Sequence, residues 1–66
     1  MSVAKVIEIT SQSPASFDDA IKKGIAKASE TVNGIQGAWI SEQKIICRGA
    51  AVTAYRVTMR VTFVVD

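Results

Sequence analysis

The chain of 66 residues fits one small domain, residues 1–66, and an apolar content of 48% excludes a disordered polypeptide. A single cysteine excludes an internal disulfide, and without histidine or a cysteine cluster an ordinary zinc site is excluded as well. A net charge of only +2, with basic and acidic residues mixed, argues against a nucleic-acid binder, and no apolar run approaches the ~20 residues that span a bilayer.

The small size of the chain predicts self-association. A domain of this length usually supplements its core with disulfides, a structural metal or oligomerisation, and the composition leaves only the last. The first ten residues, MSVAKVIEIT, lack the basic-then-apolar layout of a signal peptide, and a free cysteine fits a reducing compartment. We therefore expect a cytoplasmic homo-oligomer with neither a membrane nor a nucleic acid as partner.

The first half of the chain predicts a strand followed by a helix. Val3–Thr10 is rich in β-branched residues, as strands are, and Ser11–Pro14 has the composition of a turn. Ser16 is the predicted N-cap of a helix that runs from Phe17 to about Val32 and ends at Asn33-Gly34. Its apolar stripe consists of Phe17, Ala20, Ile21, Gly24, Ile25, Ala28 and Val32. The small residues in this stripe predict close packing of the helix on a sheet.

The second half of the chain predicts a β-hairpin. Gly37–Cys47 forms one strand, Arg48-Gly49-Ala50 the turn, and Ala51–Val65 the other strand. Alternation in the last strand places these residues on one, largely apolar face: Ala51, Thr53, Tyr55, Val57, Met59, Val61, Phe63 and Val65. Because this strand is about twice the usual length, we expect its end to overhang the domain and to meet another molecule. The order β-α-β-β predicts an α+β fold in which one helix packs on a three-stranded antiparallel sheet.

Trp39 is the residue most suited to binding a ligand. Strict alternation places it on one face with Ser41 and Gln43, and the hairpin continues that face over Arg56, Thr58, Arg60 and Thr62. An aromatic plane beside amide, hydroxyl and guanidinium donors suits a flat heteroaromatic ligand with carbonyl acceptors. The alternative is that Trp39 packs at a subunit interface, where tryptophan is enriched.

Charged residues of the hairpin leave two interpretations open. Arg56 and Arg60, four residues apart on one strand face, can bind a phosphate, a carboxylate or RNA. They can equally pair with Glu8 or Glu42 of a neighbouring chain. The same alternation places Glu42 and Lys44 on the apolar face of their strand, which predicts that another subunit covers this half of it.

No group of residues predicts catalysis or identifies a metal site. Cys47 has no histidine to activate it, and the side chain of its neighbour Arg48 points to the other side of the strand. The acidic residues show no spacing typical of a calcium loop or a paired acid and base: Glu8, Asp18, Asp19, Glu30, Glu42 and Asp66. We therefore expect a protein that is not an enzyme and whose metal ligands are unknown.

The chain resembles the dodecin family over nearly its whole length. The segments VAKVIEIT and SQSPASFDDAI are similar to the dodecin V-x-K-V-I-E strand and S-P-x-S-W/F-E-E-A-I helix start. The last strand, AYRVTMRVTFVV, and the pair Glu42-Gln43 also match. The resemblance implies a sheet wrapped partly around the helix and assembly into a hollow homododecamer. It also implies storage or buffering of riboflavin, FMN or FAD, bound as stacked pairs between subunits.

The two residues that the resemblance implies for flavin binding differ in this chain. Counted back from Glu42-Gln43, the position of the stacking tryptophan is Gly37, and the flavin-bonding glutamine of the third strand is Arg56. Trp39, on the same strand face and about 6–7 Å further along, offers a displaced stacking surface. Arg56 can donate a hydrogen bond to a ring carbonyl but cannot accept one from the ring N–H. We expect the flavin to be bound by Trp39, Gln43 and Arg56.

A second interpretation follows from the same departures. Dodecin-like proteins without the tryptophan have been associated with calcium binding. The alternative is therefore a flavin-free dodecin-like assembly that binds another small ligand or an ion such as calcium, or that has a purely structural role.

Overall fold

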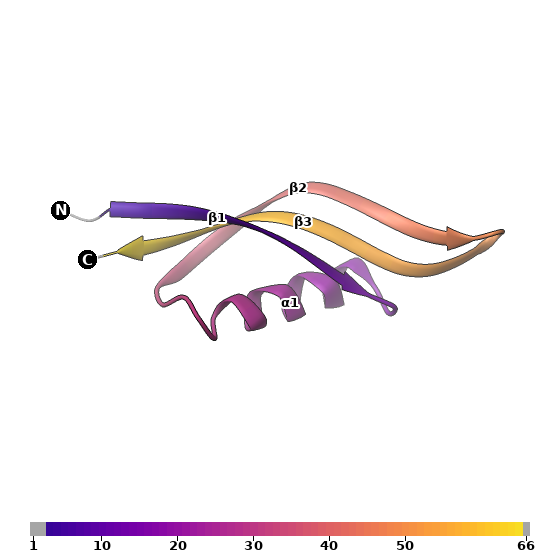
Figure 1. Cartoon of the computed structure of the whole chain (residues 1–66), viewed down its shortest axis with the longest axis horizontal. Helices are drawn as coiled ribbons and strands as arrows, with labels where there is room; N and C mark the ends of the chain where they lie inside the picture. The colour runs from indigo at the N-terminus through magenta and orange to yellow at the C-terminus, as the bar shows by residue number, and fades with distance from the viewer. Residues whose placement is uncertain (1–2, 66) are drawn as a thin grey trace.

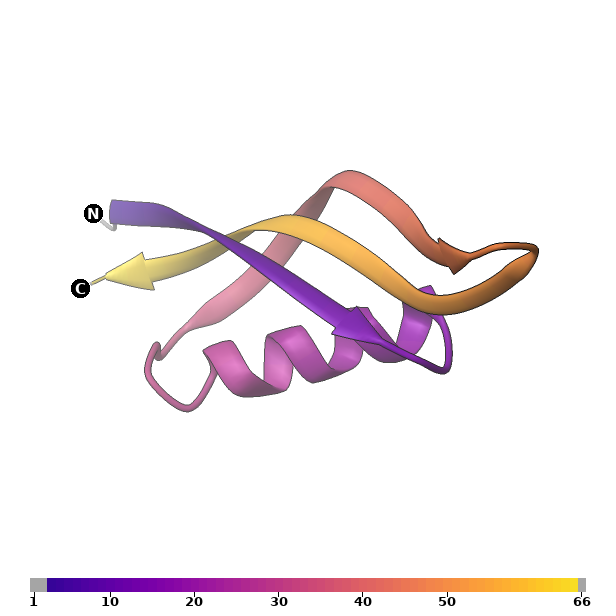
Figure 2. The same cartoon turned by 45° about the vertical axis from the view of Figure 1, so that its right-hand side comes forward.

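The computed structural model describes residues 3–65, and within them one helix lies under a sheet of three strands (Figure 1). The elements are β1, Val3–Ser13; α1, Phe17–Ala28; β2, Ile35–Arg48; and β3, Ala51–Val65. The strand order is β1-β3-β2, and β3 pairs antiparallel with both neighbours. The predicted α+β fold is therefore confirmed, and the sheet curves over one side of the helix (Figure 2).

The core lies between α1 and the middle of β3. Val57, Met59 and Val61 are fully buried at the alternate positions that the sequence predicts, and Ala20 of α1 belongs to the same cluster. The side chains packed around it are Ile7, Ile9, Phe17, Ile21, Ile25 and Ile35. Because α1 packs mainly on β1 and β3, one face of β2 is left without helical cover.

The close approach of α1 to the sheet depends on Gly24. A Cβ atom at this position would lie 2.7 Å from Met59 Cε and 2.9 Å from Ser11 Cβ, closer than non-bonded atoms allow. Ala20, Gly24 and Ala28 are all buried, as the small-residue stripe predicts. The helix therefore packs at this distance only because position 24 has no side chain.

The start of α1 is fixed by a chain of polar contacts. Ser16 is the N-cap as predicted, and its hydroxyl accepts a 3.0 Å hydrogen bond from the backbone N–H of Asp19. The Asp19 carboxylate in turn accepts a hydrogen bond from the hydroxyl of fully buried Ser13 and pairs with Lys23 at 3.0 Å. The Ser13 hydrogen bond, and after it Lys23, hold the pKa of Asp19 below its ordinary value. One carboxylate thus joins the end of β1 to the first turn of α1.

β1 and β2 are longer than the sequence predicts, whereas β3 has the predicted bounds, Ala51–Val65. β1 continues to Ser13 instead of ending at Thr10, because residues 11–13 pair with residues 55–57 of the long central strand. β2 also exceeds its predicted bounds at both ends, and a two-residue turn connects it to β3. The first residue of this turn, Gly49, has a φ of 62°, which is the left-handed conformation that two-residue hairpin turns require there.

The helix is shorter than predicted and ends at Ala28 instead of near Val32. The chain continues as a turn in which the backbone N–H groups of Thr31 and Val32 donate to the Ala28 carbonyl at 3.2 and 3.0 Å. Gly34 then adopts a φ of 77°, and its carbonyl accepts a 3.0 Å hydrogen bond from the backbone of Val64. The glycine therefore anchors the turn to β3 rather than capping the helix.

The chain is elongated, with principal extents of 51 × 19 × 14 Å. Its radius of gyration is 13.6 Å, whereas a compact domain of 66 residues has about 11 Å. Its accessible area of 4710 Å² also exceeds the about 4100 Å² typical of a monomer of 7.1 kDa. The β2–β3 hairpin extends beyond α1, as the length of the last strand predicts (Figure 1).

Apolar side chains remain exposed along the uncovered part of the sheet. Ile40 and Ile45 of β2 and Val52 of β3 are each 40–47% exposed. A chain with so small a core and an uncovered apolar hairpin is expected to bury these side chains against another molecule. The shape and the exposed residues therefore support self-association. Within residues 3–65 there is no helix of the length and apolar character needed to cross a membrane.

Candidate functional site

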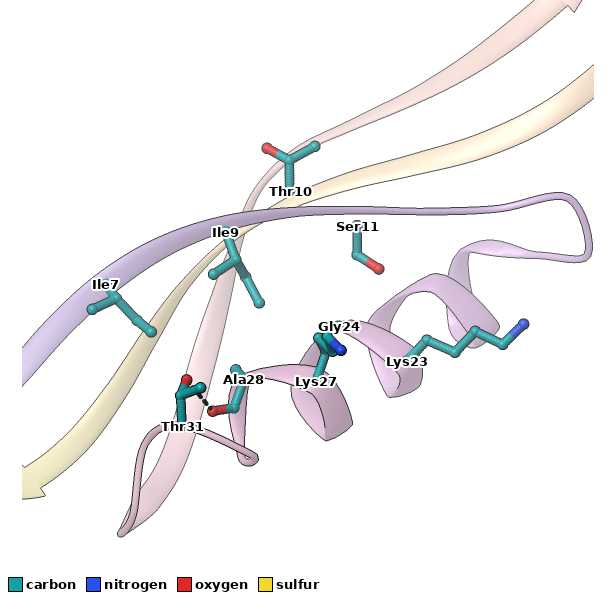
Figure 3. Close-up of a pocket in the computed structure, with 9 residues that line it drawn as sticks. All are labelled: Ile7, Ile9, Thr10, Ser11, Lys23, Gly24, Lys27, Ala28 and Thr31. Atoms are coloured by element: carbon teal, nitrogen blue, oxygen red, sulfur yellow. Dashed lines mark hydrogen bonds between the residues drawn. The ribbon is translucent and has the colours of Figure 1, made fainter.

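The sheet face that α1 leaves uncovered, here called the outer face, presents three adjacent rows of side chains. Residues paired directly across antiparallel strands point to the same face, so the register fixes each row. From β1 to β2 the rows are Glu8–Arg60–Trp39, Thr10–Thr58–Glu42 and Gln12–Arg56–Lys44. The alternation is visible on β1, where Ile9 and Ser11 point toward α1 and Thr10 points away from it (Figure 3).

Trp39 is the most exposed large apolar side chain among the described residues, at 63%. It lies directly opposite Arg60, and Glu8 is the partner of Arg60 on the other side. The prediction that Trp39 shares a face with Arg60 is therefore confirmed. An indole plane beside a guanidinium group combines a stacking surface with hydrogen-bond donors.

The prediction that Gln43 shares the face of Trp39 is wrong, because β2 contains a bulge. The register passes over Ser41, which has no partner on β3, so the side-chain alternation is reversed beyond it. Gln43 consequently lies opposite buried Val57, on the helix side of the sheet. Of the three predicted flavin-binding residues, only Trp39 and Arg56 lie on the outer face.

The bulge also moves Glu42 and Lys44 onto the outer face, whereas strict alternation places them on the apolar face. The Ser41 hydroxyl donates a 3.1 Å hydrogen bond to the backbone carbonyl of Thr58, which holds the bulge against β3. The hydroxyls of Thr10 and Thr58 lie 3.2 Å apart in a hydrogen bond across β1 and β3. The middle row therefore offers two hydroxyl groups and the Glu42 carboxylate.

Arg56 is half-buried, and its guanidinium is fixed by Gln12. Its Nε and Nη2 atoms donate to Gln12 Oε1 at 3.0 and 2.7 Å. Lys44 lies directly opposite Arg56 on β2. Because Arg56 and Arg60 are four residues apart along β3, the row of Arg56 lies about 13 Å from that of Trp39. Within a single chain, Trp39 and Arg56 therefore cannot both contact the ring of one flavin.

A groove of about 450 Å³ lies on the other side of β1, between this strand and α1 (Figure 3). It is lined by Ile7, Ile9, Thr10, Ser11, Lys23, Gly24, Lys27, Ala28 and Thr31. Its two lysines already have partners, since Lys23 pairs with Asp19 at 3.0 Å and Lys27 with Glu30 at 3.4 Å. None of the predicted ligand-binding residues lines this groove. No sequence pattern predicts this groove, because the gap depends on how α1 packs against the edge of β1.

The described residues contain no group of three histidine, cysteine, aspartate or glutamate side chains placed to hold a metal ion. Cys47 is a free, exposed thiol at the end of β2. Asp66, one of the acidic residues considered in the sequence, lies outside the described residues. The outer face is therefore the part of the described structure that best combines exposed aromatic, polar and charged groups.

The fold and the outer face define a small β-α-β-β domain whose uncovered sheet exposes aromatic and apolar side chains. The model of the dodecin family matches residues 3–66, so the chain belongs to the dodecin family. The observed β-α-β-β fold agrees with that of solved dodecin structures.

Individual relatives differ in how close they are. The protein named calcium dodecin from Mycobacterium tuberculosis is 35% identical over 63 residues, which cover 96% of this chain and 89% of the relative. The solved structure of dodecin from Streptomyces davaonensis is 29% identical with a TM-score of 0.93, covering 98% of this chain and 96% of that chain. A variant of Thermus thermophilus dodecin has a TM-score of 0.94 at 24% identity, covering 100% and 98% of the two chains, and supports the fold alone.

Proposed function

We propose that the protein assembles into a homododecameric shell that binds a flavin for storage or buffering, without catalysis. Membership of the dodecin family supports this proposal. The observation that carries it is the 63% exposure of Trp39 on the outer face, directly beside Arg60. Tryptophan presents a large stacking surface, and an exposed one with adjacent donors is suited to a flat heterocycle with carbonyl groups.

The proposed ring position is Trp39, with Arg60 as the neighbouring donor. The guanidinium of Arg60 can donate to a ring carbonyl but has no acceptor for a ring N–H. Gln43 is not part of the proposed site, because it lies on the helix side of the sheet. Arg56 stays on the outer face but, about 13 Å away, can contact only a part of the ligand that extends beyond the ring.

Native mass spectrometry after addition of FMN tests this proposal. We expect an assembly of twelve 7.1-kDa chains whose mass increases by up to one flavin per chain. The Trp39→Ala variant should keep the twelve-chain mass and lose the flavin, because the exposed indole is not part of the core. A wild-type assembly that stays free of flavin at saturating FMN would contradict the proposal.

Calcium is the second candidate ligand, and the 35% identical relative named calcium dodecin favours it. The solved structure of calcium dodecin from Mycobacterium tuberculosis, described as having a calcium-binding site, matches at 33% identity and a TM-score of 0.82, covering 92% of this chain and 87% of that chain. In this chain, Glu8 and Glu42 lie on the outer face but on opposite sides of β3, so that their Cα atoms are about 10 Å apart or more. One chain therefore cannot place both carboxylates on one ion, and a calcium site would need carboxylates from several copies.

Calcium titration with two matched variants separates this candidate from the first. If carboxylates of the outer face bind calcium, Glu42→Gln should abolish heat of binding, while Glu30→Gln, on the exposed turn after α1, should not. Binding that is equal in both variants would exclude Glu42 as a ligand.

We also propose that the protein works in the cytoplasm. The exposed thiol of Cys47, the one cysteine of the sequence, supports a reducing compartment, where such a thiol stays unpaired. Fractionation of the producing cells tests this point, and recovery of the protein outside the cytoplasm would contradict it.

A further inference from the structure

We propose that the groove between β1 and α1 binds a carboxylate with an unbranched aliphatic chain, such as a fatty acid. In this site the chain lies along Ile7 and Ile9, and Lys23 and Lys27 bind the carboxylate. The groove lies on the helix side of β1, whereas the proposed flavin position lies on the outer face (Figure 3). The inference therefore goes beyond the proposed function and does not depend on it.

The floor of the groove is aliphatic. Ile7 and Ile9 point from β1 toward α1, with Gly24 and Ala28 on the helix opposite them (Figure 3). Both isoleucines are only half-buried, so covering them with an aliphatic chain removes further apolar surface from water. None of the described residues that line the groove is aromatic, so the groove suits contact along a chain rather than stacking on a flat ring.

The size and the open side of the groove suit a small ligand. Its volume of about 450 Å³ lies within the range of about 300–1,000 Å³ that is typical of small-molecule sites. β1 is an edge strand that pairs with β3 only, so no further strand of the chain closes the groove beside it. A ligand can therefore enter along the edge of β1 without displacing a strand.

The rim of the groove is positively charged. Lys23 and Lys27 are four residues apart on α1, so they lie about one turn apart on the same side of the helix. None of the described lining residues is acidic. Two ammonium groups beside an aliphatic floor favour a chain that ends in a carboxylate over one that ends in a neutral or cationic group.

The ion pairs that the two lysines already form are weak enough to be exchanged for a ligand. Lys23 pairs with Asp19 at 3.0 Å and Lys27 with Glu30 at 3.4 Å, and the lysine side chains are 65% and 83% exposed. Exposed pairs of this kind contribute little to stability. Asp19 also keeps the hydrogen bond from the Ser13 hydroxyl when Lys23 turns to a ligand. Neither carboxylate belongs to the lining of the groove.

The first arm of the test locates the ligand. Decanoate is added to the assembled protein with isotope-labelled isoleucine methyl groups, and the methyl signals are followed by NMR. We expect saturable shifts at Ile7 and Ile9 with NOEs to the decanoate chain, while Ile40 and Ile45, the exposed isoleucines of β2, stay unchanged. No shift at Ile7 and Ile9, as when another copy fills the groove, would overturn the inference. Equal shifts at all four residues would also overturn it, because they would show unspecific adsorption.

The second arm tests the charge of the rim. Decyltrimethylammonium has the same chain as decanoate but a positive head group, and we expect it to bind about tenfold or more weakly. Because exposed ion pairs are weak, Lys23→Gln and Lys27→Gln should each weaken decanoate binding only about two- to fivefold.

Lys22→Gln is the matched control for both lysine variants. It removes the same charge from the same helix, but Lys22 pairs with Asp18 at 3.2 Å and does not line the groove. We expect its affinity for decanoate to match that of the wild type. Equal affinities of the wild type for the two amphiphiles, or equal losses in the three lysine variants, would overturn the inference and leave the flavin proposal untouched.

Discussion

Trp39 of β2 lies directly opposite Arg60 of β3, on the sheet face that α1 leaves uncovered. Tryptophan at 63% exposure beside a guanidinium group is a stacking surface with a donor at its edge. Neither side chain belongs to the buried cluster around Met59, so both can be changed without removing core packing. The predictions for binding and for folding can therefore be tested separately.

Replacing Trp39 by alanine should weaken flavin binding. Stacking on an aromatic side chain contributes about 1–3 kcal/mol per base, so the expected loss is about 5- to 150-fold in affinity. Trp39→Phe should retain part of the affinity because it keeps an aromatic plane, and its thermal unfolding should match that of the wild type. Affinities that are equal in the wild type, Trp39→Phe and Trp39→Ala would remove Trp39 from the site.

Adding a single methyl group at Gly24 should destabilise the protein. The new Cβ would lie 2.7 Å from Met59 Cε and 2.9 Å from Ser11 Cβ, and overpacking of this kind costs about 1–3 kcal/mol. The better helix propensity of alanine offsets about 1 kcal/mol of that cost. We expect a net loss of up to about 2 kcal/mol in chemical denaturation at fixed protein concentration.

Gly37→Ala is the matched control for this substitution. The nearest atom to its added Cβ is Thr62 Oγ1 at 3.8 Å, an ordinary contact. We expect no loss of stability at this position. A Gly24→Ala variant as stable as Gly37→Ala would show that α1 does not pack on the sheet as closely as described.

The contribution of Asp19 to stability should disappear at low pH. Its pKa in the folded chain is lowered from the ordinary 3.8, by the Ser13 hydrogen bond first and by Lys23 second. A lowered pKa means that the ionised carboxylate stabilises the fold above pH 3.8 and that this contribution is lost as the pH falls through the folded-state pKa. We therefore expect Asp19→Asn to melt below the wild type at pH 7 and the two melting temperatures to converge at acidic pH.

Asp18→Asn provides the comparison for this pH profile. Asp18 lies in the same helical turn and pairs with Lys22 at 3.2 Å, but its side chain is 75% exposed and such pairs contribute little. Its melting temperature should stay near that of the wild type at pH 7. A constant difference between Asp19→Asn and the wild type down to pH 2 would contradict the assignment of the effect to the carboxylate.

A charge on the overhanging hairpin should break the assembly. Ile45 is 47% exposed on the helix side of β2, the strand that α1 contacts least, and we expect another copy to bury it. Ile45→Lys should therefore reduce the mass measured by light scattering and lower the melting temperature, because the isolated chain has a small core. Lys22→Gln, on the exposed side of α1, should change neither. A stable assembly of unchanged mass in Ile45→Lys would place the interface elsewhere.

The fold follows from patterns that are local in the sequence. Alternate residues of β3 are fully buried: Val57, Met59 and Val61. Their burial requires a helix that packs close to the strand, and the missing side chain of Gly24 makes room for Met59. The N-cap Ser16 likewise acts within one turn of the helix. These features could be predicted because each depends on residues close together in the chain.

The composition of the outer face could be predicted only in part. The outer face contains Trp39, Arg56 and Arg60, as expected. Beyond the bulge at Ser41, however, Lys44 lies on this face and Gln43 on the helix side, the reverse of the prediction. No glycine or proline marks this bulge, and it is held by a hydrogen bond to the backbone of Thr58, a contact 17 residues away in sequence. Strict alternation therefore fails where the pairing of two strands, rather than the sequence of one, sets the register.

The most direct test of the proposed function is a titration of the purified protein with FMN that follows both flavin and tryptophan fluorescence, with the mass of the assembly measured in the same sample. Trp39 is the one tryptophan of the chain, so any tryptophan quenching reports on this side chain. We expect saturable mutual quenching at about one flavin per chain, as stacking on Trp39 requires, while the mass stays at twelve chains. An intact assembly that quenches neither signal would contradict flavin binding at the outer face.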